Sequence, residues 1–420
     1  VVALVVLCGA SFYVYKTNDV NETYENKETK EVNNNMLSMM LETSAGSGEY
    51  QQTTASSWPT EGYTFNETLS KCEQGSSLSW DNEKKQVIFD GNTKDDCYIY
   101  FDVYIPPRYD EICDESLFAC YVAKQYTGTQ GENNMYYHDS TLTNGAGDNS
   151  YRYAGSRDTT NNFVCFGYDS TDGTCPTDYL YRIIGVFDNQ VKLIKYDYGT
   201  TTELGTDGDY YNTYSGAGWS SSSYGINKGS NAKTEIGVYH WNYSNAGSSK
   251  NIWSESRLNT TNLNTNFLNN IGTSWSNKIA THTWKVGGNK YANIAILTVP
   301  NAYKNEITSP ANETTYDAKV GLMYVSDYGY ATAPSAWTTK LSSYNDLSVT
   351  NVNWMYMGLY EWPMTRRSDG SYNAFFIYYD GRVYYSNVSE GNAIRPTFYL
   401  NSNVSYVSGY GTDSSPILIK

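Results

Sequence analysis

The chain is poor in basic residues and has almost no histidine. Its 420 residues hold 29 lysines and arginines against 44 aspartates and glutamates, so the formal net charge is −15. Nucleic-acid binding depends on a basic surface that neutralises phosphates, so no nucleic-acid partner is expected. The GxSxG, HExxH and GxxxxGKS/T patterns are absent, and His138, His240 and His282 stand beside no nucleophile motif. We therefore assign no catalytic residue.

Aromatic residues, in contrast, are abundant: the chain has 43 tyrosines and 10 tryptophans. The segments between them are rich in Asn, Ser, Thr and Gly. A disordered polar chain is poor in aromatic residues, so this chain is expected to fold. Tyr, Trp and Thr suit the pleated, half-buried surface of a sheet, which favours a structure rich in β-strands.

Six of the seven cysteines lie downstream of an apolar N-terminal run, and the seventh, Cys8, lies within it. Six cysteines allow many connectivities, but their grouping along the chain favours three disulfides: Cys72–Cys97, Cys113–Cys120 and Cys165–Cys175. No Cys-x-x-Cys spacing suits zinc, so no metal site is expected. Disulfides in turn indicate an oxidising compartment.

The first fifteen residues, VVALVVLCGASFYVY, carry no charge and are followed by Lys16. A membrane-spanning helix needs about 20 apolar residues. Because the first residue is Val rather than Met, we expect residues 1–16 to be a truncated transmembrane or signal-anchor segment. A cleavable signal region and a buried strand or helix are the alternatives. The anchor predicts an extracellular protein held at the cell surface through the membrane.

The rest of the chain divides into four expected regions of an α+β protein. Residues 17–49 form a polar linker with a short apolar helix at 36–41 (MLSMML), and residues 50–105 form a small disulfide-stapled antiparallel β module. Residues 106–175 have too few periodic apolar residues for a core of their own and form a loop-rich, disulfide-containing subdomain. Residues 176–420 form the main domain.

Two elements of the main domain are predicted from local patterns. The segment YRIIGVFDNQVKLIKYD (181–197) has two β-branched runs about Asp188 and Asn189, which predicts a hairpin. Apolar residues at positions 258, 263, 267 and 271 predict a helix over 253–271. Gly272 is its expected stop.

A second hairpin near the C-terminus suggests a binding surface. Asp380 and Gly381 predict a two-residue primed turn. Alternation then directs Phe375, Ile377 and Val383 to the core. The opposite face carries Phe376, Tyr378, Arg382 and Tyr384. Large rings exposed together offer contact area with little loss of rotamer freedom, so this face is expected to recognise a ligand. The alternative is that a second layer covers the rings.

An ordered set of segments in the main domain resembles a known family. The segments are YRIIGV (181–186), VKLIK (191–195), Trp253 with LN (258–259), FLN (267–269), GLMYVSD (321–327) and IRPTFYL (394–400). Their succession resembles bacterial surface proteins with a C-type-lectin-like domain of the DUF6273 kind, which are similar to the fibrobacter major paralogous (FISUMP) domains. The resemblance implies that residues 176–420 form such a domain, with a small antiparallel sheet and long loops.

The resemblance also implies which residues face a ligand. The ligand-binding candidates are Trp362, Tyr372, Asn373, Phe376, Tyr378, Tyr379, Arg382, Tyr384 and Tyr385, and Arg395 and Pro396 are expected to be structural. Sulfatase-modifying relatives of this fold use a cysteine pair late in the domain. No cysteine follows Cys175, so that chemistry is not expected.

The sequence thus predicts a non-catalytic extracellular surface protein that binds a host or microbial surface protein or glycan. Two alternatives stay open. One is a structural surface or filament component that self-assembles, and the other is a secreted glycoside hydrolase with a carboxylate pair. No cofactor is expected. A structural calcium ion at Asp207–Asp209 or Asp169–Asp172 is the alternative to ordinary turns, although neither stretch has EF-hand spacing.

Overall fold

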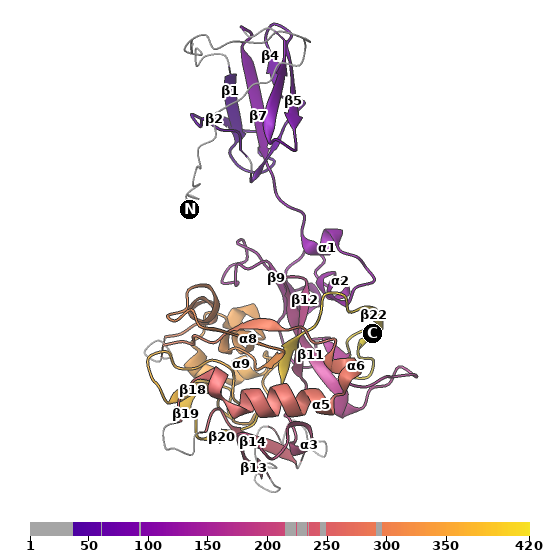
Figure 1. The fold of residues 1–420 in the computed structure, drawn as a ribbon, viewed down its shortest axis with the longest axis vertical. Helices are drawn as coiled ribbons and strands as arrows, with labels where there is room; N and C mark the ends of the chain where they lie inside the picture. The colour runs from indigo at the N-terminus through magenta and orange to yellow at the C-terminus, as the bar shows by residue number, and fades with distance from the viewer. Residues whose placement is uncertain are drawn as a thin grey trace, which may run out of the picture. The chain divides into compact units, whose positions relative to one another are not determined.

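The computed structural model describes residues 37–59, 61–91, 94–214, 224, 233, 235–243, 249–290 and 296–420. The chain divides after Arg108 into two compact units, called unit 1 and unit 2 below (Figure 1). Helices and antiparallel sheets occur together, which confirms the α+β class. The predictions for residues 1–36, including the anchor, lie outside the described residues. Within the described ranges, no helix has the length and apolar character needed to cross a membrane.

Unit 1 is a small β module centred on β7 (Cys97–Val103). Its other strands are β1 (Leu37–Glu42), β2 (Tyr50–Gln52), β3 (Tyr63–Phe65), β4 (Lys71–Cys72), β5 (Ser77–Asp81) and β6 (Gln86–Asp90). One sheet has the order β2-β1-β7-β3 with β4 also on β7, and β5 and β6 form a separate hairpin. Ile99 and Phe101 of β7 are fully buried against Met39, Trp58 and Val87.

The short helix predicted at 36–41 is wrong for the residues that are described. Leu37–Glu42 is strand β1, which pairs in parallel with β7 and antiparallel with β2. The periodicity of a six-residue apolar run cannot distinguish a helix from a strand. Here the run is a strand because it pairs with the backbone of β7. The β module therefore begins before residue 50, and the expected boundary at 49/50 is also wrong.

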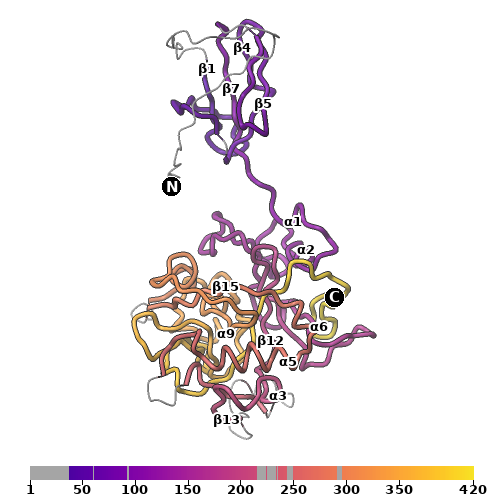
Figure 2. The backbone as a smooth tube through the Cα atoms, in the orientation of Figure 1, coloured from indigo at the N-terminus to yellow at the C-terminus, as the bar shows by residue number. Residues whose placement is uncertain are grey.

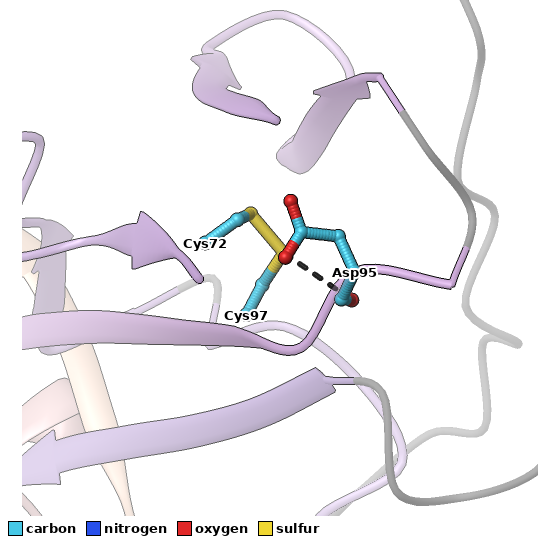
Figure 3. A group of neighbouring side chains, drawn as sticks. All are labelled: Cys72, Asp95 and Cys97. Atoms are coloured by element: carbon cyan, nitrogen blue, oxygen red, sulfur yellow. Dashed lines mark hydrogen bonds between the residues drawn. A yellow bond between two sulfur atoms is a disulfide. The ribbon is translucent and has the colours of Figure 1, made fainter. Parts of the chain in front are cut away.

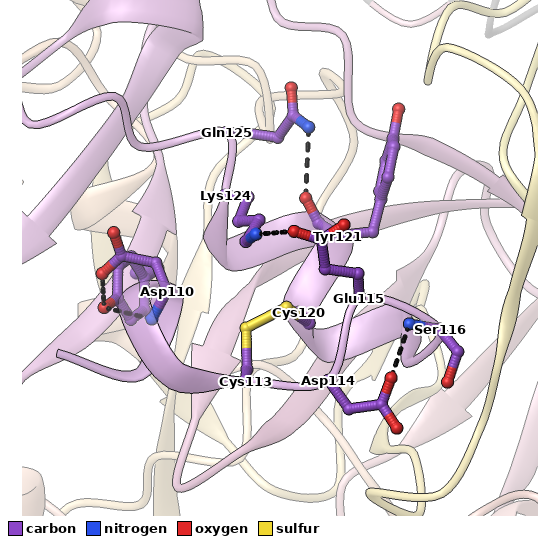
Figure 4. Close-up of a disulfide and its surroundings, with 10 residues drawn as sticks. Asp110, Cys113, Asp114, Glu115, Ser116, Cys120, Tyr121, Lys124 and Gln125 are labelled. Carbon is purple, nitrogen blue, oxygen red and sulfur yellow. Dashed lines mark hydrogen bonds and ion pairs between the residues drawn. A yellow bond between two sulfur atoms is a disulfide. The ribbon is translucent and has the colours of Figure 1, made fainter.

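The three predicted disulfide pairings are confirmed. Cys72–Cys97 joins the neighbouring strands β4 and β7, and Cys165–Cys175 closes a ten-residue separation. Cys113–Cys120 ties the turn after α1 (Tyr109–Ile112) to α2 (Phe118–Ala123), as Figure 4 shows. Each link closes a short loop, which is why closeness in sequence predicted the partners.

Unit 2 is organised around a seven-stranded sheet. Its strands are β8 (Met135–His138), β9 (Ser150–Tyr153), β10 (Phe163–Cys165), β11 (Leu180–Phe187), β12 (Gln190–Lys195), β17 (Val320–Gly321) and β21 (Thr397–Tyr399). The order is β17-β21-β12-β11-β9-β8, with β10 also on β11. Because β8, β9 and β10 complete this sheet, residues 109–175 belong to unit 2. The loop-rich region expected at 106–175 is thus part of the same unit as residues 176–420, and the structure shows no division at 175/176.

The hairpin predicted at 181–197 is confirmed as β11 and β12. Phe187 pairs with Gln190 across a two-residue turn in which Asp188 and Asn189 have φ of 46° and 64°. Two consecutive positive φ values are the signature of a type I′ turn. Gly185 lets β9 approach closely, since a Cβ at this position would lie 2.1 Å from the carbonyl oxygen of Tyr151.

The long helical segment predicted at 253–271 is also present. It comprises the 3₁₀ turn η5 (Trp253–Glu255), the π-helix η6 (Leu258–Phe267) and α5 (Leu268–Asn270). Leu258, Leu263 and Phe267 are fully buried. Gly272, at φ 79°, ends the segment. Figure 2 traces η6 and α5 as one continuous helical tube along unit 2.

Shorter elements complete unit 2. The strands are β13 (Tyr210–Tyr214), β14 (Ile236–His240), β15 (His282–Lys285), β16 (Thr315–Ala318), β18 (Asn373–Ile377), β19 (Val383–Asn387), β20 (Gly391–Asn392), β22 (Tyr406–Ser408) and β23 (Leu418–Ile419). The helices are α3 (Thr201–Leu204), α6 (Thr273–Ser276), α7 (Val299–Tyr303), α8 (Val325–Tyr330) and α9 (Leu347–Thr350). Single turns are η1 (Glu132–Asn134), η2 (Thr177–Tyr179), η8 (Lys304–Thr308), η9 (Pro334–Ala336) and η10 (Leu341–Ser343).

Most large rings of unit 2 are in its core. Among the residues that the structure describes, the fully buried tryptophans are Trp241, Trp253, Trp284, Trp337, Trp354 and Trp362. Burying such a ring removes a large apolar area from water, so these residues contribute strongly to stability. The rings that remain exposed are therefore the ones that can contact a ligand.

Candidate ligand-binding surface

The second predicted hairpin is formed by β18 and β19. Phe376 pairs with Tyr384, and Ile377 pairs with Val383. The predicted two-residue primed turn is wrong, because Gly381 donates its N–H to the Tyr378 carbonyl and is the residue of this turn with positive φ, 98°. The connection is thus a four-residue β-turn that ends in a left-handed glycine.

Packing against the body of unit 2 selects this turn. A Cβ on Gly381 would lie 2.9 Å from the carbonyl oxygen of Tyr344 and 2.7 Å from a methyl carbon of Thr350. The Gly381 carbonyl also accepts a hydrogen bond from the buried Tyr328 hydroxyl at 2.8 Å. The tip of the hairpin is therefore fixed rather than free.

A buried ion pair supports the hairpin from below. Glu361 forms bridges with both Ile377 and Ala393, so its segment lies beside β18. Arg395 holds the Glu361 carboxylate with two hydrogen bonds of 2.7 and 3.0 Å and donates a third, of 2.8 Å, to the Met355 carbonyl. Both side chains are about 2% exposed. Arg395 is thus structural, as expected.

Pro396 also has a structural position. It is buried next to Arg395, and its carbonyl accepts the Lys195 N–H at 3.0 Å. Proline cannot donate to a neighbouring strand, so the contact to β12 is made through the carbonyl alone.

The inward face of the hairpin is as predicted. Phe375, Ile377 and Val383 are at most 2% exposed. The prediction that Trp362 and Phe376 contact a ligand is wrong, because Trp362 is fully buried and Phe376 is only 6% exposed. Trp362 donates its ring N–H to the Tyr239 carbonyl at 2.9 Å, and its ring lies 6.0 Å from that of Phe376. These two rings form the floor of the surface and do not reach solvent.

Five tyrosines form a connected surface above this floor. We call them the tyrosine patch: Tyr360, Tyr378, Tyr379, Tyr384 and Tyr385. Ring centroids are 4.8 Å apart for Tyr360 and Tyr378, 4.7 Å for Tyr378 and Tyr379, and 4.9 Å for Tyr384 and Tyr385. Phe376 links the two groups, at 5.8 Å from Tyr378 and 6.5 Å from Tyr384. The rings support one another and present a preorganised surface.

The patch reaches solvent mainly through two of its members. Tyr379 is 44% exposed and Tyr384 is 43% exposed, whereas the other three are partly buried. Burial raises the pKa of Tyr360, and its contact with the Tyr378 hydroxyl raises it further. Tyr360 is therefore a neutral hydrogen-bonding phenol at physiological pH.

Two arginines lie over rings of the patch. The Arg382 guanidinium carbon is 4.3 Å from the centroid of Tyr378, and that of Arg367 is 4.6 Å from the centroid of Tyr385. Each arginine also meets a neighbouring aspartate, Asp380 at 3.5 Å and Asp369 at 3.0 Å. The arginines therefore add flat surface and hydrogen-bond donors while their charges are balanced locally.

Tyr372 and Asn373 lie at the base of the hairpin. Tyr372 is 49% exposed, and its carbonyl accepts the Val388 N–H. Asn373 is partly buried, with its side-chain oxygen 3.5 Å from an Arg367 nitrogen. Both positions are compatible with the predicted contact to a ligand.

The acidic loop at Asp207–Asp209 has a structural role. Asp209 is 1% exposed, and its carboxylate accepts the N–H groups of Arg257 and Leu258 at 2.8 and 2.9 Å. It thereby caps the start of η6. Asp207 accepts a hydrogen bond of 2.6 Å from Asn266. A calcium ion at these residues stays a prediction.

One group of residues has the composition of a metal site. In the described part of the chain, Cys72, Asp95 and Cys97 are the three such side chains whose donor atoms lie within 4.8 Å of one another (Figure 3). The two sulfur atoms form a disulfide, and the Asp95 carboxylate accepts the N–H groups of Gln74 and Ser76 at 2.6 and 2.9 Å. Metals bind thiolates rather than disulfide sulfur, so the closed disulfide does not supply such ligands.

Sequence reasoning missed Tyr360 and Arg367. Tyr360 is two residues before Trp362 and therefore lies on the same face of the extended segment. This spacing could have identified the partly exposed Tyr360 as a candidate in place of the buried Trp362. Arg367 lies on a segment that bridges to β18, and its guanidinium reaches Tyr385 on the paired strand β19.

Comparisons with known proteins do not add a relative: no family model matches the chain, and neither does any curated protein or solved structure.

Proposed function

We propose that the chain is a non-catalytic extracellular surface protein that binds a protein or glycan through the tyrosine patch. Residues 109–420 would then be the C-type-lectin-like domain, and residues 1–16 the membrane anchor. The observation that carries the proposal is the continuous run of ring contacts from Tyr379 to Tyr385, with two rings more than 40% exposed. Three disulfides support export to an oxidising compartment.

The patch has the physical properties of a recognition surface. Tyrosine supplies flat contact area and a hydroxyl at a low entropic cost. The rings are already ordered by contacts with one another and with Arg382, so binding would immobilise few side chains. Because the arginine charges are balanced by Asp369 and Asp380, the surface suits a ligand held by apolar contact and hydrogen bonds.

The experiment is a screen of the purified chain on arrays of glycans and of cell-surface proteins, followed by affinity measurements on each hit. Tyr379→Ala and Tyr384→Ala remove the two exposed rings without emptying the core. A buried anchor ring at an interface is worth about 2 kcal/mol, which weakens Kd about 30-fold. Tyr410→Ala is the matched control, since Tyr410 is 79% exposed and outside the patch.

The proposal fails if Tyr379→Ala and Tyr384→Ala bind every hit as tightly as the parent chain. A mass that increases with concentration in light scattering, together with no hits, would instead favour the self-assembling surface component.

A further inference from the structure

A lysine and an aspartate face each other in the core of unit 2. Lys192 projects from β12 and Asp327 from α8, and Lys192 Nζ lies 2.6 Å from Asp327 Oδ2. Their side chains are 1% and 3% exposed. Lysine and aspartate are rarely buried to this extent, and removing both charges from water carries a large desolvation cost.

Four aromatic rings enclose the lysine nitrogen. Their centroids lie at 4.7 Å (Tyr324), 5.1 Å (Tyr399), 5.5 Å (Trp284) and 5.6 Å (Phe187) from Nζ. Such a shell keeps bulk water away from the pair. A near-attack geometry requires reacting atoms about 3–3.5 Å apart with aligned orbitals. A nitrogen that hydrogen-bonds a carboxylate oxygen meets the distance requirement at the carboxyl carbon.

The amine of the pair is shifted toward its neutral, reactive form. Burial lowers the pKa of Lys192, although Asp327 opposes the effect, so the neutral, nucleophilic amine is easier to reach. Glu306 is a second buried carboxyl that interacts electrostatically with both residues. It accepts hydrogen bonds from the Ser326 N–H at 3.0 Å and the Thr365 hydroxyl at 2.8 Å. Burial raises its pKa to about 7, which suits proton exchange near neutral pH.

We propose that Lys192 and Asp327 become joined by an intramolecular isopeptide bond. Lys192 Nζ attacks Asp327 Cγ, one C–N bond forms, and one C–O bond breaks. The ammonium loses two protons, which leave with one carboxylate oxygen as a single water molecule, so no oxidant or second reactant is needed. Whichever Asp327 oxygen leaves, the one that remains has a donor nearby. Oδ2 accepts the Tyr324 N–H at 2.8 Å, and Oδ1 lies 3.9 Å from the Arg152 guanidinium.

The product removes the electrostatic cost of the pair. An amide is neutral and is satisfied by ordinary hydrogen bonds, whereas two buried charges depend on exact pairing. The bond would also connect β12 to α8 across 135 positions of the chain. Unlike the three disulfides, this link would survive reducing agents.

Intact-mass spectrometry of the full chain, fully reduced and denatured, tests the proposal. The expected mass is one water below the mass of the sequence, and a protease digest should yield a branched peptide that joins Lys192 to Asp327. A mass equal to that of the sequence would overturn the proposal. So would a water loss that maps to any other pair of residues.

Substitutions locate the reaction. Lys192→Met and Asp327→Ala should keep the full mass, whereas Asp327→Asn should give the same cross-linked product by loss of ammonia. Lys195→Met is the matched control, since Lys195 is equally buried and lies 2.6 Å from Glu203, and it should still lose water. Glu306→Gln should slow the appearance of the lighter species during refolding. Water loss from Lys192→Met would refute the assignment.

Discussion

Replacing Arg395 by methionine should destabilise unit 2 by about 4 kcal/mol, because removing one partner of a buried ion pair leaves the other charge unpaired. The Glu361 carboxylate would lose both of its hydrogen bonds from the guanidinium, and the Met355 carbonyl would lose one. Arg382→Met is the matched control. Its pair with Asp380 is 3.5 Å long and partly exposed, so its loss should cost less than about 1 kcal/mol.

The assay is urea unfolding monitored by tryptophan fluorescence, since six tryptophans among the described residues of unit 2 are fully buried. In a parallel thermal melt, unit 2, which has about 310 residues, should show a fall in Tm of about 6 °C for a loss of about 4 kcal/mol. The double variant Glu361→Leu with Arg395→Met removes both charges and should recover most of the loss. The reasoning is refuted if Arg395→Met costs no more than Arg382→Met, or if the double variant is the least stable of the three.

Three further outcomes are expected. Replacing Cys72 and Cys97 together by alanine releases a loop with a sequence separation of 25 and should cost unit 1 about 3 kcal/mol; equal unfolding midpoints would contradict this. Burial lowers the pKa of all three histidines, that of His282 to about 4, so NMR titration should show no midpoint near 6.5. Each histidine binds its proton less tightly in the folded than in the unfolded state. Its contribution to the free energy of unfolding is therefore complete above pH 6.5 and is lost as the pH falls toward 4. Asn189, at φ 64°, should tolerate glycine, whereas Asn189→Val should cost about 1–2 kcal/mol in thermal unfolding; equal stability of the two would count against the type I′ turn.

Elements defined by neighbouring residues were predictable from the sequence. The β11–β12 hairpin follows from two residues that tolerate positive φ between β-branched runs, and the disulfides follow from cysteines that are close along the chain. The helical segment that ends at Gly272 follows from its apolar spacing. In each case the determining interactions lie within a few turns or a short loop.

Elements defined by distant partners were not predictable in this way. Strand β1 is held by β7, about 60 positions away, and its six residues carry no periodicity that separates strand from helix. The burial of Trp362 depends on Tyr239, 123 positions away. The Lys192–Asp327 pair leaves no local pattern at all. The predicted hairpin face was therefore right about exposure at Tyr384 and wrong at Phe376. Of the candidates that the resemblance implied, Tyr379 is exposed and Trp362 is buried.

Protection of tyrosines from chemical nitration tests the proposed function most directly. In the free chain, the exposed Tyr379, Tyr384 and Tyr410 should all be nitrated, as their exposed fractions of 44, 43 and 79% require. When a ligand identified on the arrays is present at a saturating concentration, peptide mass spectrometry should show that Tyr379 and Tyr384 become protected while Tyr410 reacts as before. Unchanged nitration of Tyr379 and Tyr384 in the presence of bound ligand would contradict recognition through the tyrosine patch.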